Sequence, residues 1–205
     1  MKLYRKRIAA TVDTEVHKKI FTILAGINGV GKSSMMGVLK SASDSYGTII
    51  DPDDYARKYG GNLSGGKEAI KDIEFCLKNG LAFTEETTLS GNHIINTAKR
   101  AKSLGYEVHL IYIGLNSAQD SIDRVANRVK RGGHNIPNDT IIRRYNSRFV
   151  QLSKILEYCD SAKFYTNYNG YQLVATYDGA TATISQIVDT PPAWLDEFFA
   201  YMGVE

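Results

Sequence analysis

The sequence predicts an α/β fold with a mainly parallel sheet and helices on both of its faces. Short apolar runs of strand length alternate along the chain with segments whose apolar residues recur at helical spacing. A glycine-rich turn joins the first apolar run, Ile20–Ala25, to the first helical segment, 34–40. Strands that alternate with helices in this way form parallel sheets covered on both faces.

Each expected element has its own signal in the sequence. The expected strands are short apolar runs at 20–25, 48–50, 81–85, 107–113, 163–165 and 171–176. The expected helices cover 34–40, 67–78, 92–104, 117–130 and 139–158, and a last helix opens at Pro191-Pro192. Asn79-Gly80 and Gly105 are stop signals, and Ser117 is a helix cap. We expect a glycine-rich loop at 59–66.

Length and composition fit one domain with a full hydrophobic core. The chain has 205 residues, of which 43% are hydrophobic and 23% are charged. We interpret 1–205 as a single domain with an N-terminal extension or helix at 1–19, a core at 20–180 and a C-terminal helix at 181–205. Cys76 and Cys159 fall in apolar helical patterns and are expected to be reduced core residues.

The charge and hydropathy patterns limit the partners. The net charge of +3 is too small to argue for nucleic acid, although it is compatible with small phosphorylated molecules. No run approaches the roughly 20 apolar residues of a membrane span, and no apolar run follows the basic N-terminus as in a signal peptide. We therefore expect a cytoplasmic protein that binds neither membranes nor nucleic acid.

Residues 26–33 read Gly-Ile-Asn-Gly-Val-Gly-Lys-Ser and fit the phosphate-binding pattern G-x-x-x-x-G-K-S, known as Walker A. Gly26, Gly29 and Gly31 let the backbone curl so that its N–H groups point at phosphates. Lys32 places a cation at the β- and γ-phosphates, and the Ser33 hydroxyl is a ligand for Mg²⁺. The helix that follows directs its positive end at the same anion.

This loop predicts binding of ATP and Mg²⁺ in a three-layer P-loop NTPase fold. Asn28 and Ser34 are expected to belong to the same nucleotide-binding segment. A glycine-rich turn with a surface lysine is the structural alternative. It is disfavoured because the pattern lies between an apolar strand and a helix, which is the context that the motif requires.

Two absent patterns favour a small-molecule kinase within this fold. The chain lacks the Asn/Thr-Lys-x-Asp sequence that specifies guanine in GTPases. Motor ATPases need an apolar strand that ends in Asp, whereas 107–113 is followed by Gly114-Leu115-Asn116.

A kinase also needs a carboxylate that orients the acceptor hydroxyl and takes its proton. Asp51, Asp53 and Asp54 follow the second expected strand and compete for that role. A solvated acidic turn is the alternative.

The strand at 81–85 leads into Glu86, Thr87 and Thr88. Glu86 either holds Mg²⁺ through water or binds substrate hydroxyls together with the two threonines. Equally, these residues are typical caps of a helix N-terminus.

Arg124, Arg128 and Arg131 form one face of the helix at 117–130. We interpret Arg124 as part of the solvated face. Arg128 and Arg131 adjoin the Gly132-Gly133 break, where arginines can stabilise a transferred phosphate.

His134, beyond that break, is either a phosphate contact or a residue that packs the loop. On the next helix, Arg144 and Arg148 share a face, and one of them is expected to reach the nucleotide.

The ordered set of motifs resembles the zeta toxin family of kinases. The set comprises the P-loop, Asp-Pro-Asp, then Glu-Thr-Thr-Leu-Ser-Gly at 86–91 and Arg-Val-Lys-Arg-Gly-Gly-His-Asn-Ile-Pro at 128–137. It is most similar to the compact bacterial branch often labelled as predicted ABC-type ATPases, and the matches run from about 20 to 180.

The resemblance implies an ATP- and Mg²⁺-dependent kinase that phosphorylates a nucleotide sugar such as UDP-N-acetylglucosamine. It places the catalytic base on Asp53, with Tyr55 at the aromatic position of the motif, and the P-loop lysine on Lys32. It places ATP-contacting arginines on Arg128 and Arg131. An antitoxin partner is implied only by the habit of the family.

Two alternatives stay open at the level of the sequence. The first is a kinase for another hydroxyl, such as that of a nucleoside, NAD or an antibiotic. The second is a nucleotide-binding regulatory module without turnover, which would have no need of Asp53.

Overall fold

The computed structural model describes residues 18–42 and 46–204. The expected N-terminal extension at 1–19 lies almost entirely outside the described residues. The expected C-terminal helix is present as α9, Ala193–Met202.

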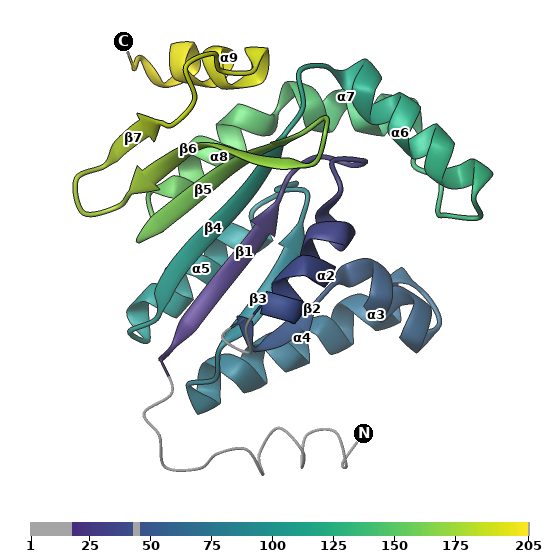
Figure 1. Ribbon diagram of the computed structural model, residues 1–205. Coiled ribbons are helices and arrows are strands. Elements are labelled where there is room, and N and C mark those ends of the chain that lie inside the picture. Colours follow the sequence, from purple (N-terminus) through teal and green to yellow (C-terminus); the bar gives the residue numbers. More distant parts are fainter. Residues whose placement is uncertain (1–17, 43–45, 205) are drawn as a thin grey trace.

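A seven-stranded sheet with the order β2-β3-β1-β4-β5-β6-β7 forms the centre of the described chain (Figure 1). Its strands are β1 Ile20–Ala25, β2 Thr48–Ile50, β3 Phe83–Thr87, β4 Glu107–Gly114, β5 Ser161–Asn167, β6 Tyr171–Asp178 and β7 Thr183–Gln186. The strands from β2 to β5 in this order are parallel, and β6 and β7 are antiparallel additions. The predicted α/β class with a mainly parallel sheet is confirmed.

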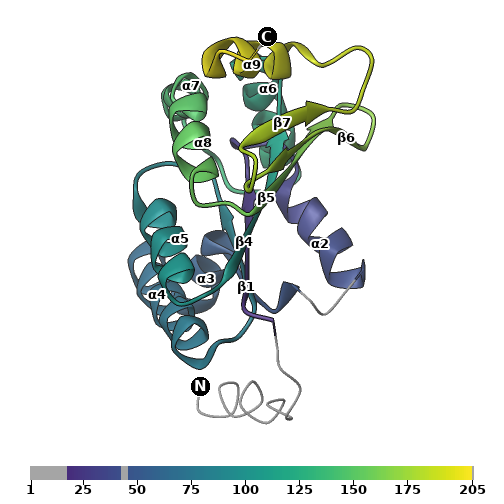
Figure 2. The same ribbon diagram turned by 90° about the vertical axis from the view of Figure 1, so that its left-hand side faces the viewer.

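Helices cover both faces of this sheet. They are α2 Lys32–Ala42, α3 Pro52–Tyr59, α4 Asn62–Asn79, α5 His93–Ser103, α6 Ala118–Lys130, α7 Asn138–Asn146, α8 Arg148–Leu156 and α9. Figure 2 shows α3, α4, α5 and α8 on one side of the sheet and α2 on the other. No helix of the described residues is long and apolar enough to cross a membrane.

The expected loop at 59–66 is wrong, because most of it is the first turn of α4. Gly65 is buried in that turn, where an added Cβ would lie 2.5 Å from the backbone nitrogen of Ala56 in α3. This glycine allows two helices to pack closely, so it does not mark a loop. The acidic turn after β2 is likewise a helix, α3, which Asp51 caps.

The single helix expected at 139–158 is also wrong, because the chain breaks at Ser147 into α7 and α8. The Ser147 hydroxyl donates to the carbonyl of Arg143, which is the kind of local bond that competes with regular helix. β7 was not predicted, because it is short, mostly exposed and carries one aliphatic residue, Ile184.

The core contains both cysteines, as predicted. Cys76 and Cys159 are free and buried. Burial raises the pKa of the Cys76 thiol to about 11 and that of Cys159 to about 12. Both residues are therefore neutral thiols at physiological pH.

The end of β4 is closed by Trp194 of α9. An added Cβ at Gly114 would lie 2.3 Å from the indole ring, which is fully buried. β4 pairs in parallel with β1, which leads into the phosphate loop, so this contact attaches the C-terminal helix to the edge of the sheet where ligands bind in such folds.

Gly114→Ala should displace the Trp194 ring and lower the free energy of unfolding by about 1–3 kcal/mol, the usual cost of overpacking. Trp194 is the one tryptophan of the chain, so its fluorescence emission should shift to longer wavelength. Gly37→Ala is the matched control, because Gly37 has open space around its Cβ position. Unchanged emission and stability in Gly114→Ala would contradict this packing.

Candidate active site

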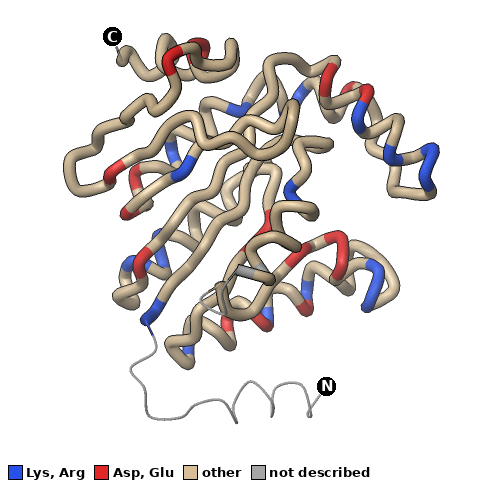
Figure 3. The backbone as a smooth tube through the Cα atoms, in the orientation of Figure 1, with Lys and Arg blue, Asp and Glu red and all other residues tan. Residues whose placement is uncertain are grey.

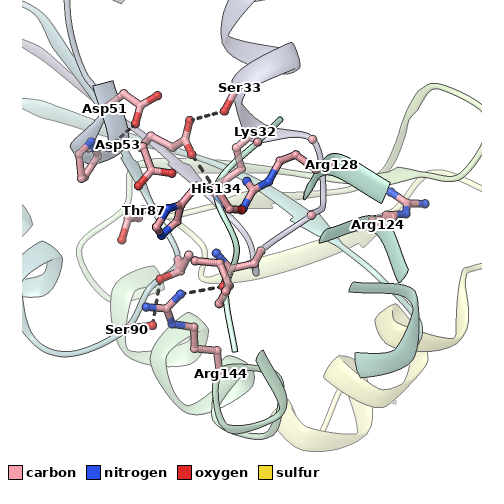
Figure 4. Close-up of a pocket in the computed structure, with 18 of the residues that line it drawn as sticks. Lys32, Ser33, Asp51, Asp53, Thr87, Ser90, Arg124, Arg128, His134 and Arg144 are labelled. Carbon is pink, nitrogen blue, oxygen red and sulfur yellow. Dashed lines mark hydrogen bonds and ion pairs between the residues drawn. The ribbon is translucent and has the colours of Figure 1, made fainter. Parts of the chain in front are cut away.

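A cavity of about 860 Å³ lies at the carboxyl ends of the central strands (Figure 4). Of the residues that the sequence analysis assigned to nucleotide or substrate binding, all but Gly26 line this cavity, and so does Asp53, one of the three competing aspartates. The lining also contains Asp51 and Arg144, which the sequence left as alternatives, and Arg124, which it placed on a solvated face. Residues of the lining that were not singled out include Asn62, Glu85, Ser90 and His93.

The pairing of β1 explains this convergence. β1 lies between β3 and β4, with Leu24 opposite Glu86 and Ala25 opposite Thr87. The phosphate loop therefore leaves β1 beside the end of β3.

The phosphate loop is shaped by glycines with positive φ. Gly26 has φ 145°, and an added Cβ there would lie 2.4 Å from the carbonyl oxygen of Ile113. Gly31 has φ 100°, and its Cβ would lie 2.5 Å from Asn167 and 2.8 Å from Tyr171. Only glycine fits either position.

The hairpin between β5 and β6 holds the outer side of this loop. Asn167 Nδ2 donates to the carbonyl of Val30 at 2.8 Å, and the Tyr171 hydroxyl donates to the carbonyl of Gly31 at 2.6 Å. In a trans peptide the N–H points away from the C=O. Fixing these two carbonyls on the hairpin side therefore points the amides of Gly31 and Lys32 the other way, where phosphates would bind.

Lys32 is buried within the loop. Its Nζ donates to the carbonyls of Gly26 at 2.9 Å and Ile27 at 3.2 Å, and it lies 3.8 Å from Glu86 Oε1. Burial lowers the pKa of Lys32, against the opposing effect of Glu86. An ammonium group kept here can exchange its carbonyl partners for phosphate oxygens.

Glu86 faces the phosphate loop from β3. The Ser33 hydroxyl donates to Glu86 Oε2 at 3.4 Å. Burial raises the pKa of Glu86 to about 7, although the charge of Lys32 opposes this shift. The helix-cap alternative for Glu85, Glu86 and Thr87 is wrong, because these residues lie inside β3 and the next helix starts at His93.

The three aspartates after β2 have different surroundings. Asp51 Oδ1 accepts from the backbone N–H groups of Asp53 and Asp54 and caps α3. Asp54 pairs with Arg57 on the exposed side of that helix. Asp53 is left as an exposed carboxylate that lines the cavity, and its charge acts on Lys32. Burial raises the pKa of Asp51.

Arginines from α6 line the opposite side of the cavity. Figure 3 shows basic residues along α6 and acidic residues at the start of α3. Arg128 donates to the carbonyl of His134 at 2.7 Å, which holds the 131–137 segment against α6. Arg131 and His134 are exposed residues of the lining. Arg124 is not on a solvated face, because it lines the cavity and donates to the carbonyl of Asn167 at 2.6 Å.

Of the two arginines in the following segment, Arg144 reaches the site and Arg148 does not. Arg144 donates to Asn28 Oδ1 at 2.7 Å, which ties α7 to the phosphate loop. Arg148 stacks on Tyr145 and pairs with Glu197.

Hydroxyl groups gather where β3 ends. Thr87 Oγ1 accepts from the backbone N–H of Leu89, and the hydroxyls of Thr88 and Ser90 lie 2.9 Å apart. Leu89 has φ 54°, a conformation that a leucine rarely adopts and that turns the chain sharply after the strand.

The residues present fit a nucleotide with Mg²⁺. The loop offers inward amides and the Lys32 ammonium, and Ser33 and Glu86 offer oxygen ligands. Among the described residues, no group of three or more His, Cys, Asp or Glu is arranged as a complete metal site.

The fold and this site define an α/β protein of the P-loop kinase-like class. No protein-family model matches the chain. A protein of Haemophilus influenzae named "Uncharacterized protein" is 37% identical over 135 residues, which cover 63% of this chain and 93% of that protein. The chain belongs to the same family as that protein.

Solved structures support the same fold at low identity. A chain from the PezAT chromosomal toxin-antitoxin system of Streptococcus pneumoniae gives a TM-score of 0.62 at 17% identity, over 98% of this chain and 91% of that one. AvrRxo1-ORF1 with ORF2 and ATP gives 0.62 at 16% identity, over 96% and 70%. The fold implied by the resemblance to the zeta toxin family is confirmed.

Removing the Tyr171 hydroxyl tests the role of the hairpin. Tyr171→Phe should weaken ATP binding by about 2- to 13-fold, the equivalent of one hydrogen bond of about 0.5–1.5 kcal/mol, because the Gly31–Lys32 peptide loses an anchor. Calorimetric titration measures this change. Tyr177→Phe, on the same strand but opposite Ile184 of β7, is the control and should bind ATP like the wild type.

Proposed function

We propose that the protein is an ATP-dependent kinase that transfers the γ-phosphate to a hydroxyl group of a small molecule. One observation carries this proposal. A free carboxylate, Asp53, and a buried ammonium group, Lys32, line the same cavity as the glycine-rich loop. A site that only bound nucleotide would have no need of the carboxylate.

In the proposed reaction, Asp53 takes the proton of the acceptor hydroxyl while the oxygen of that hydroxyl attacks the γ-phosphorus. The bond to the oxygen that bridges the β- and γ-phosphates breaks, and ADP leaves with its electron pair. Lys32 stabilises the charge on the phosphates. Arg128 and Arg131 support the same charge from α6, and Arg144 does so from α7.

Mg²⁺ would be held by the Ser33 hydroxyl, with Glu86 as the neighbouring carboxylate, directly or through water. It would neutralise charge on the β- and γ-phosphates. Of the two roles that the sequence leaves open for Glu86, we propose the one at the metal, because Glu86 accepts from Ser33.

For the acceptor we propose a nucleotide sugar such as UDP-N-acetylglucosamine. The support is the resemblance to zeta toxins, together with the hydroxyl groups of Thr88 and Ser90 near the end of β3. Asp53, Glu86 and the arginines line one cavity, which supplies both a base and cations for such a transfer.

A toxin role with an antitoxin partner belongs to the same proposal. The PezAT structure is described as a toxin-antitoxin system, and it shares the fold of this chain. Expression of the chain should then arrest bacterial growth, because phosphorylation would deplete a metabolite that the cell needs. Lys32→Ala should relieve the arrest. Harmless expression at high level would argue against this role.

Asp53→Asn should lower kcat by about 10²- to 10⁴-fold, the usual contribution of a general base, and should leave ATP binding intact. The measurement is mass-spectrometric detection of the phosphorylated product from UDP-sugars and nucleosides with Mg-ATP. Asp54→Asn is the matched control, because Asp54 pairs with Arg57 outside the cavity. Equal kcat for wild type and Asp53→Asn would reject this residue as the base.

A further inference from the structure

Neighbouring glutamates on β3 point to opposite faces of the sheet. Glu86 faces the phosphate loop through Ser33 and Lys32. Side chains alternate along a strand, so Glu85 faces the layer that contains α4 and α5. There, Glu85 Oε1 lies 3.2 Å from Nε2 of His93, the first residue of α5.

The carboxylate of Glu85 is costly to bury and only partly satisfied. Its side chain is 6% exposed, and Oε2 is a buried atom without a hydrogen-bond partner in the described part of the chain. A buried carboxylate oxygen without a partner lowers stability unless something else supplies a donor. Glu85 lines the cavity, so that donor can come from a ligand.

His93 gives this carboxylate a half-exposed partner. The His93 side chain is 53% exposed and also lines the cavity. Its hydrogen bond to Glu85 raises the pKa of the imidazole. The pair therefore offers a ligand the half-exposed imidazole and, behind it, a carboxylate that still lacks one donor among the described residues.

The elements that line the cavity contribute side chains of different charge. The arginines of the lining come from α6 and α7. Among the described residues of the lining that α4, α5 and 85–90 contribute, His93 is the one base, and Glu85 already shares its charge. The others here are Asn62, Gly66, Glu86, Thr87, Thr88, Ser90 and Ile94.

We infer that the Glu85–His93 pair binds the acceptor through a hydroxyl-rich or amine-bearing end that carries no phosphate. This inference rests on the proposed kinase function and adds the chemical class of the acceptor end. A phosphate placed beside Glu85 would meet a buried carboxylate without a free cation to offset it. Sugar hydroxyls or an ammonium group would instead donate to the unsatisfied oxygen.

The rigid placement of the pair supports a recognition role. Glu85 lies in the middle of the sheet, opposite Ile23 of β1 and Ile50 of β2. A carboxylate fixed in this way can select one orientation of a polyol. The competing explanation is that Glu85 only stabilises the N-terminus of α5 through the helix dipole.

The test is calorimetric titration of the full chain, loaded with Mg²⁺ and a non-hydrolysable ATP analogue. The ligands are N-acetylglucosamine, glucosamine, glucosamine 6-phosphate and UDP-N-acetylglucosamine. Glu85→Gln keeps the shape of the side chain. His93→Gln changes a half-exposed side chain, so we expect the variant to fold. Glu107→Gln is the matched control, since Glu107 pairs with His109 at 3.4 Å outside the cavity lining.

We expect at least one of N-acetylglucosamine, glucosamine and UDP-N-acetylglucosamine to bind, and glucosamine 6-phosphate to bind more weakly than glucosamine. Both cavity variants should lose at least about tenfold in affinity for the bound ligand, which is the scale of a hydrogen bond to a charged group. Affinity for the ATP analogue should stay within about twofold in every variant, because the pair lies apart from the phosphate loop.

Two results would overturn this inference. One is that none of the ligands binds, and the other is that both cavity variants bind them like wild type while only their melting temperature falls. Phosphate transfer is measured separately on the same variants, with Mg-ATP in place of the analogue. Ligand binding that depends on Glu85 and His93, without phosphate transfer, would reject the kinase proposal and keep the inference. Phosphate transfer that is unchanged in both cavity variants would keep the kinase proposal and reject the inference.

Discussion

The buried ammonium group of Lys32 is the constraint on which the site depends. It is 7% exposed, and its partners are two loop carbonyls and the carboxylate of Glu86. Burial lowers the pKa of Lys32 and raises the pKa of Glu86, so it favours the neutral form of each group. The charge of each residue opposes the pKa shift of the other. Buried ion pairs add little net stability to a fold. We therefore interpret this pair as a charge held ready for an anionic ligand.

The glycine curl that surrounds Lys32 needs support from outside the loop. Asn167 and Tyr171 hold its carbonyls from the β5–β6 hairpin, and the Ser121 hydroxyl donates to the carbonyl of Asn28 at 2.5 Å. These contacts come from segments far along the chain. The hairpin beyond the parallel strands thus has a purpose in the site, because it fixes the direction of the phosphate-facing amides.

Local patterns in the sequence were sufficient for the phosphate loop and for most of the sheet. They were insufficient where a side chain's role depends on its neighbours in space. Local patterns did not separate the three aspartates after β2, and only the resemblance favoured Asp53. In the structure, the cap made by Asp51 and the outward pair of Asp54 distinguish Asp53 from both. Asn167 and Tyr171 had no local signal, because each acts on a loop about 140 residues away. Gly65 suggested a loop, because sequence cannot tell flexibility from close packing.

Charge divides the cavity along its length. Arginines enter from α6 and α7, whereas acids and hydroxyls enter from α3 and β3, and Lys32 lies between them. In the proposed reaction the γ-phosphate crosses this boundary. Negative charge spreads over its oxygens while the acceptor loses a proton, so cations are needed on one side and a base on the other. Glu85 adds a carboxylate from β3 to the lining, and an acceptor oriented by it would present its hydroxyl to the base with its anionic groups directed elsewhere.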